Sequence, residues 1–99
     1  MTTKLFIKSI QEYDYTLSLI KKAISAEINK FEMAMDLANQ RLVSYENKYH
    51  VTSEHFISDM TAEDLNGGDD EYVSWAGEYK LKQRLEKKLS GLKGIEYEN

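Results

Sequence analysis

Residues 10–49 have the sequence IQEYDYTLSLIKKAISAEINKFEMAMDLANQRLVSYENKY, which contains neither Gly nor Pro. Apolar side chains recur in it at steps of three and four residues, at Ile10, Tyr13, Leu17, Ile20, Ile24, Ile28, Phe31, Met35, Ala38, Leu42, Tyr45 and Tyr49. We call this set the apolar stripe. Because such positions share one side of an α-helix, the spacing predicts a long amphipathic helix with coiled-coil character. A helix of this length spans roughly 60 Å, far more than a compact domain of this size needs.

The composition of the 99 residues indicates one folded domain without room for a second core. Apolar residues make up 41% of the chain, unlike a disordered sequence, and charged residues make up 30%, which suits an extended helical protein. The chain has no Cys, so disulfides and thiolate metal sites are excluded. No window approaches about eighteen apolar residues, and the N-terminus has no long apolar segment. We therefore expect a cytoplasmic protein without membrane contact.

The charged residues are distributed unevenly. Between residues 49 and 79 there is no Lys or Arg, and this region holds the carboxylates of Glu54, Asp59, Glu63, Asp64, Asp69, Asp70, Glu71 and Glu78. All 13 bases lie elsewhere, although the net charge of the chain is −4. We expect an acidic end and a mildly basic shaft, and the net negative charge of the chain argues against a nucleic-acid ligand. The acidic end is either a solvated turn with capping carboxylates or a docking surface for a basic partner.

The beginning of the long helix is open to two interpretations. The apolar patch at residues 5–7 either extends the helix or folds back on it. Ser9 and Glu12 have the spacing of a capping box, which would start the helix near residue 10, whereas a Thr at residue 2 or 3 would cap an earlier start. We predict a helix that begins between residues 3 and 10 and covers about 10–49.

Residues 50–69 are predicted to connect this helix to a second one and to contain a short helix. Thr52 or Ser53 is a suitable N-cap for that short helix. Thr61 is followed three residues later by a carboxylate, a pattern that predicts one more helical turn. The Asn-Gly-Gly sequence at residues 66–68 is the strongest stop signal in the chain.

A second helix is predicted at about 70–92, followed by a short tail at 95–99. Three acidic residues, at 69–71, complement the dipole at its beginning. The expected fold is therefore all-α, a long antiparallel helical hairpin with a short connecting helix.

The two predicted helices differ in length, and this difference predicts a dimer. The second helix spans roughly 35 Å, so it covers only residues 28–49 of the first. The apolar stripe over residues 10–24 is then left without a partner in the chain, and exposed apolar surface of that extent usually marks an interface. We predict a two-fold dimer in which these residues pair: Ile10, Tyr13, Leu17, Ile20 and Ile24.

The sequence contains no catalytic or metal-binding constellation. His50 and His55 are the only histidines, and their spacing of five does not place them on one helix face. Residues 64–75 fail the calcium-loop pattern at its fifth, sixth and twelfth positions. There is no nucleophile beside a base, no phosphate-binding Gly loop and no paired-carboxylate cleft. We predict a protein without enzymatic activity, cofactor or metal.

Three aromatic residues of the second helix, Tyr72, Trp75 and Tyr79, recur at helical spacing. In one interpretation they pack in the core against Phe31, Met35, Tyr45 or Tyr49. In the other, Trp75 lies at the edge of the hairpin as an interface anchor, because Trp and Tyr dominate binding hot spots.

The order of several short motifs also carries a family resemblance over residues 45–92. These motifs are Glu46-Asn47-Lys48-Tyr49, Ser53-Glu54-His55-Phe56, Gly68-Asp69-Asp70, Tyr72-Val73-Ser74-Trp75-Ala76-Gly77, and the leucines Leu85, Leu89 and Leu92. In this layout the chain resembles small helical antitoxin-like proteins of bacterial and archaeal toxin–antitoxin gene pairs. The resemblance implies a protein that binds a small toxin, often an RNA-cleaving one, through residues 69–79 and without catalysis.

We therefore expect a helical interaction protein that forms a dimer and binds and neutralises a protein partner such as a basic toxin. The predicted partner-binding residues are Asp69, Asp70, Glu71, Tyr72, Trp75 and Tyr79. The alternative is a coiled-coil homo-oligomer with a structural or assembly role. A small helical enzyme or nucleic-acid binder is a third, weaker hypothesis.

Overall fold

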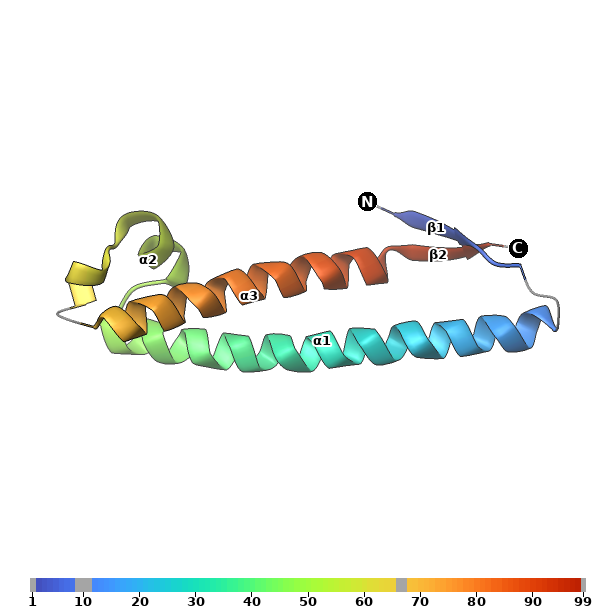
Figure 1. The fold of residues 1–99 in the computed structure, drawn as a ribbon, viewed down its shortest axis with the longest axis horizontal. Helices are drawn as coiled ribbons and strands as arrows, with labels where there is room; N and C mark the ends of the chain where they lie inside the picture. Colours follow the sequence, from blue (N-terminus) through green and yellow to red (C-terminus); the bar gives the residue numbers. More distant parts are fainter. Residues whose placement is uncertain (1, 9–11, 66–67, 99) are drawn as a thin grey trace.

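The chain forms an elongated helical hairpin. The computed structural model describes residues 2–8, 12–65 and 68–98. The molecule measures 62 × 21 × 17 Å, and its radius of gyration of 19.3 Å exceeds the value of about 13 Å for a compact chain of this length. Helix α1 (Tyr13–Tyr49) runs along the whole rod, and helix α3 (Asp69–Lys93) lies beside one half of it (Figure 1). The predicted all-α helical hairpin is confirmed.

Helix α1 begins later than predicted and ends where predicted. Its first residue is Tyr13, with Glu12 as N-cap, so the predicted start between residues 3 and 10 is wrong. The proposed cap Ser9 lies outside the described residues. At the other end His50 adopts a left-handed conformation, with φ of 56° and ψ of 36°, which terminates the helix after Tyr49.

The connection contains the predicted short helix, α2 (Ser53–Asp59), and a 3-10 turn, η1 (Ala62–Leu65). The Thr52 hydroxyl caps α2, because its Oγ1 accepts a hydrogen bond of 3.1 Å from the backbone N–H of His55. The Asp64 carboxylate accepts one of 2.8 Å from the backbone N–H of Thr61. Both capping predictions are confirmed.

Helix α3 packs antiparallel to α1. Three ion pairs join the helices in opposite chain order: Lys48–Glu71, Arg41–Glu78 at 3.1 Å, and Glu32–Lys93 at 2.8 Å. Between them the buried side chains are those of Ala38, Leu42, Trp75, Leu85 and Leu89. Helix α3 therefore covers the C-terminal half of α1, as the predicted helix lengths require.

The terminal segments form a small parallel sheet that the sequence analysis does not predict. Strand β1 (Thr3–Phe6) pairs with β2 (Ile95–Glu98), with Thr3 opposite Ile95, and the N–H of Thr3 also donates to the Gly94 carbonyl at 2.8 Å. Figure 1 shows this sheet beside the N-terminal half of α1. The segment at residues 3–6 is thus a strand, and the predicted tail at 95–99 is a strand over Ile95–Glu98, while its last residue lies outside the described residues.

One face of this sheet is directed towards α1. Leu5, Ile95 and Tyr97 are half-buried, whereas the side chains of Lys4, Phe6 and Glu96 on the other face are exposed. The ammonium group of Lys21 on α1 lies 5.2 Å from the centroid of the Tyr97 ring. The two strands therefore supply the cover that α3 does not.

This cover corrects the expectation that residues 10–24 of the apolar stripe have no partner in the chain. Tyr13, Leu17, Ile20 and Ile24 are half-buried, and Ile10 lies outside the described residues. The chain reaches further than its helix lengths suggest, because a helix rises about 1.5 Å per residue whereas an extended strand advances about 3.3 Å per residue. The predicted dimer through this seam stays a prediction, but its premise of an uncovered seam is wrong.

Candidate functional site

The closed end of the hairpin is built around the side chain of Trp75, which is 0% exposed. The rings of Phe56, Tyr45 and Tyr49 stack on its indole, with centroid distances of 3.8, 5.4 and 5.7 Å. The indole N–H donates a hydrogen bond of 2.9 Å to Oγ of Ser53, which is 1% exposed. The indole N–H at the centre of this aromatic cluster therefore has its hydrogen-bond acceptor.

The burial of Trp75 decides between the two interpretations of the aromatic residues. The predicted contacts with Tyr45 and Tyr49 are confirmed. Phe31 lies elsewhere along the hairpin, where the ammonium group of Lys88 is 5.3 Å from its ring centroid. Because Trp75 is enclosed, its side chain offers no surface to a partner, and the role of interface anchor does not fit this conformation.

Phe56 supplies the closest stacking contact with Trp75, and the sequence analysis missed this contact. Helical spacing alone does not say which neighbour the apolar side chains of a short helix meet. The backbone N–H of Ser53 donates a hydrogen bond of 2.8 Å to Oε2 of Glu46. This bond ties the first residue of α2 to α1 and so places Phe56 over the indole.

Glu71 joins the first turn of α3 to the last turn of α1. The ammonium group of Lys48 donates to one carboxylate oxygen and the hydroxyl of Tyr49 donates to the other. The hydrogen bonds from Lys48 and Tyr49 hold the pKa of the Glu71 carboxyl below its usual range. The bond to Glu71 raises the pKa of Lys48, and the same kind of bond together with desolvation raises the pKa of the Tyr49 phenol. Glu71 therefore has a structural role in the hairpin.

Two of the eight predicted acidic residues are neutralised by bases from α1. Glu71 pairs with Lys48, and Glu78 pairs with Arg41. Residues 50–78 contain no Lys or Arg, but this end of the molecule does contain bases, because antiparallel packing brings cations of α1 to it. Two further carboxylates have local roles: Asp59 lies 3.1 Å from Nδ1 of His55, and Asp64 caps η1.

The other four of these eight carboxylates are exposed and have no hydrogen-bond or ion-pair partner among the described residues: Glu54, Glu63, Asp69 and Asp70. They come from α2, η1 and α3, the three elements that meet at the closed end (Figure 1). Of the six predicted partner-binding residues, Asp69 and Asp70 are exposed, Glu71, Tyr72 and Tyr79 are half-buried, and Trp75 is buried. We call the four free carboxylates the acidic end.

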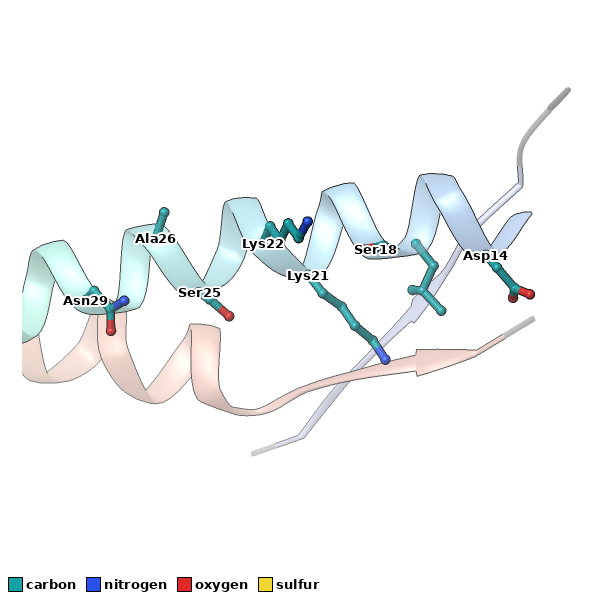
Figure 2. Close-up of a pocket in the computed structure, with 8 residues that line it drawn as sticks. Asp14, Ser18, Lys21, Lys22, Ser25, Ala26 and Asn29 are labelled. Atoms are coloured by element: carbon teal, nitrogen blue, oxygen red, sulfur yellow. The ribbon is translucent and has the colours of Figure 1, made fainter. Parts of the chain in front are cut away.

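The rest of the described surface offers little for small-molecule chemistry. Within residues 2–8, 12–65 and 68–98, no three His, Asp or Glu side chains converge to hold a metal ion. One open depression is lined by residues of α1, among them Ser18, Lys21 and Ser25 (Figure 2). In the same part of the chain, neither long helix has a stretch long and apolar enough to cross a membrane.

Comparison with models of known families, with curated proteins and with solved structures found no match to this chain.

Proposed function

We propose that this chain is a non-enzymatic cytoplasmic interaction protein whose acidic end binds a basic protein surface, as an antitoxin-like protein binds and neutralises a small toxin. The observation that carries the proposal is the exposure of four unpartnered carboxylates, Glu54, Glu63, Asp69 and Asp70, at one end of the rod. The resemblance of residues 45–92 to antitoxin-like proteins supports the same role.

The architecture suits such a surface physically. A stacked aromatic core and the Glu71 network hold α2, η1 and α3 together beneath the acidic end. A preformed surface loses less conformational freedom on binding than a flexible one. Carboxylates facing a cationic partner speed association. They would also block a phosphate-binding groove of that partner, because they mimic the negative charge of the phosphates.

Co-expression with the product of the adjacent gene tests the proposal. We expect the two proteins to copurify, and we expect the activity of the neighbouring protein to fall when the complex forms. A neighbouring protein whose yield and activity are the same with and without this chain would contradict the proposal.

A second candidate function is a coiled-coil homo-oligomer with a structural or assembly role. The observation that favours it is a set of exposed apolar side chains on α1, including Leu19 at 53% and Met33 at 69% exposure. Charge reversal at Asp69 and Asp70 separates the candidates, because it should abolish partner binding and leave self-association intact.

A further inference from the structure

Helix α1 carries a second set of apolar residues on the side that faces away from the rest of the chain. Its members are Tyr15, Leu19, Ala26, Met33 and Leu37, which we call the outer row. The four large side chains are 56, 53, 69 and 51% exposed, in chain order. Figure 2 shows Ala26 pointing away from α3 and β2, whereas Lys21 points towards β2. This face thus has no cover from the parts of the chain that the structure describes.

The members of the outer row share one side of α1, with Lys22 and Lys30 in the gaps between Leu19, Ala26 and Met33. The steps between its members are four, seven, seven and four residues. At about 100° of rotation per residue, all five lie within an arc of about 40°, opposite the apolar stripe. Heptad spacing of this kind is typical of a helix that packs against another helix.

The sequence of steps reads the same in both directions, with Ala26 at its centre. When two copies of such a helix pair antiparallel about a two-fold axis at Ala26, Leu19 meets the partner's Met33. By the same register Tyr15 meets the partner's Leu37, and each Ala26 meets the other. A two-fold interface requires a surface that is complementary to itself. The symmetry of the row therefore identifies its occupant as a second copy of this chain.

One pair of charged neighbours of the row favours the antiparallel arrangement. The exposed Glu12 lies beside the partner's Arg41, whose side chain is 56% exposed. The lysines do not distinguish the two arrangements. In a parallel pair Lys22 and Lys30 each face their own copies, and in the antiparallel register Lys22 is level with the partner's Lys30. Their long side chains direct the ammonium groups away from the seam into water.

The size of the row is sufficient for a specific contact. Four large side chains that are half exposed or more contribute roughly 100 Å² each, so a pair of rows buries about 1,000 Å² with its flanking atoms, the lower bound for a specific interface. The small Ala26 at the centre lets the helix axes approach to about 8 Å.

We propose that two copies of the chain form an antiparallel two-fold dimer through the outer row, with Ala26 on the axis. This interface replaces the predicted seam at residues 10–24, which β1 and β2 cover. The dimer does not depend on the function of the acidic end.

Single cysteines test the register directly, because the chain has no cysteine of its own. The Ala26→Cys variant should form a disulfide-linked dimer under mild oxidation. The Ser44→Cys variant is the matched control, since residue 44 is exposed and lies on the same face exactly five turns further along α1. In the proposed dimer the two copies of residue 44 are about 54 Å apart and cannot join. Equal cross-linking of both variants indicates parallel pairing and would overturn the proposal.

Sedimentation velocity tests the contact without a cross-link. The unmodified chain should sediment as a dimer, and Leu19→Glu should raise the dissociation constant at least about tenfold because it places a carboxylate against Met33. Adding Met33→Lys to that variant should restore the dimer, since the two new charges meet across the axis. Circular dichroism checks that each variant remains helical. A monomeric unmodified chain, or a double variant no tighter than Leu19→Glu alone, would overturn the proposal.

Discussion

At the scale of single residues, the hydrogen bond between Trp75 and Ser53 explains why a polar side chain occupies the centre of an aromatic cluster. Both side chains are buried, so neither group can exchange its partner for water. A buried donor that loses its acceptor costs about 1–3 kcal/mol. Ser53 is therefore part of the core, although the sequence analysis considered it only as a possible cap.

We expect Ser53→Ala to lower the free energy of unfolding by about 1–3 kcal/mol, because it leaves the indole N–H unsatisfied. The same substitution in a Trp75→Phe background should cost much less, since that ring has no N–H to satisfy. Urea unfolding of the four chains of this double-mutant cycle measures the difference. Equal costs in both backgrounds would show that the hydrogen bond does not contribute.

The Glu71 network predicts a pH dependence of stability. Because the pKa of the Glu71 carboxyl is lower in the folded chain than in the unfolded chain, its charge stabilises the fold above the unfolded pKa. This contribution disappears as the pH falls through the lower, folded pKa. Lys48 and Tyr49 have raised pKa values, so their contributions are present below their unfolded pKa values and disappear as the pH rises through the folded ones.

Glu71→Gln should therefore lower the urea midpoint at neutral pH and have progressively less effect in acid. Glu86→Gln is the control, because this exposed carboxylate makes only a long pair of 4.0 Å with Lys82. Urea midpoints measured from neutral to acid pH should converge for the Glu71 variant and the unmodified chain. A difference that stays constant over this range would contradict the assigned role of the carboxylate.

At the scale of elements, the main finding is that two short terminal strands complete the packing of a long helix. The four extended residues after α3 reach further along α1 than four helical residues would, because a strand is longer per residue than a helix. The sheet has only two strands and lies at the ends of the chain, so its stability depends on its contact with α1.

We expect Leu5→Thr to reduce hydrogen-exchange protection over residues 13–24, because it removes an apolar side chain from the inner face of β1. Phe6→Thr is the matched control, since its side chain is 67% exposed on the outer face of the same strand. Both substitutions introduce Thr, a residue that favours strands. Equal loss of protection in the two variants, or loss over residues 38–49 instead, would contradict the assigned packing.

The elements that could be predicted from the sequence depend on local signals. The end of α1 at Tyr49, the Thr52 cap and the stop before α3 each follow from a few neighbouring residues. The β1–β2 pairing joins residues from opposite ends of the chain, and no local pattern specifies such a partner. The alternation Ile95-Glu96-Tyr97-Glu98 is a strand signal, but four residues are too few to distinguish a strand from a tail.

At the site, the sequence located the acidic residues but not which of them are free. Periodicity placed Tyr72, Trp75 and Tyr79 on one helix face without showing how deeply each is buried. The pairing of Glu71 with Lys48 depends on the antiparallel register, which is a property of the folded hairpin. The set of free carboxylates is therefore visible only in the structure.

At the scale of the whole molecule, the hairpin and the proposed dimer together define a long rod. The end of α1 lies about 35 Å from Ala26, so the antiparallel dimer places its two acidic ends about 70 Å apart, at opposite ends. Two partners would then bind independently. The outer row and the acidic end belong to different parts of the surface, and substitutions in one should leave the other unaffected.

If the acidic end binds a basic protein, reversing its charge must weaken that binding. Titration calorimetry would compare the unmodified chain, Asp69→Lys/Asp70→Lys, and the control Glu27→Lys/Glu86→Lys, each with the copurified product of the adjacent gene. We predict a loss of at least about a hundredfold in affinity for the first variant, little change for the control, and weaker binding at high salt. Equal affinity of all three proteins would show that the acidic end does not bind this partner.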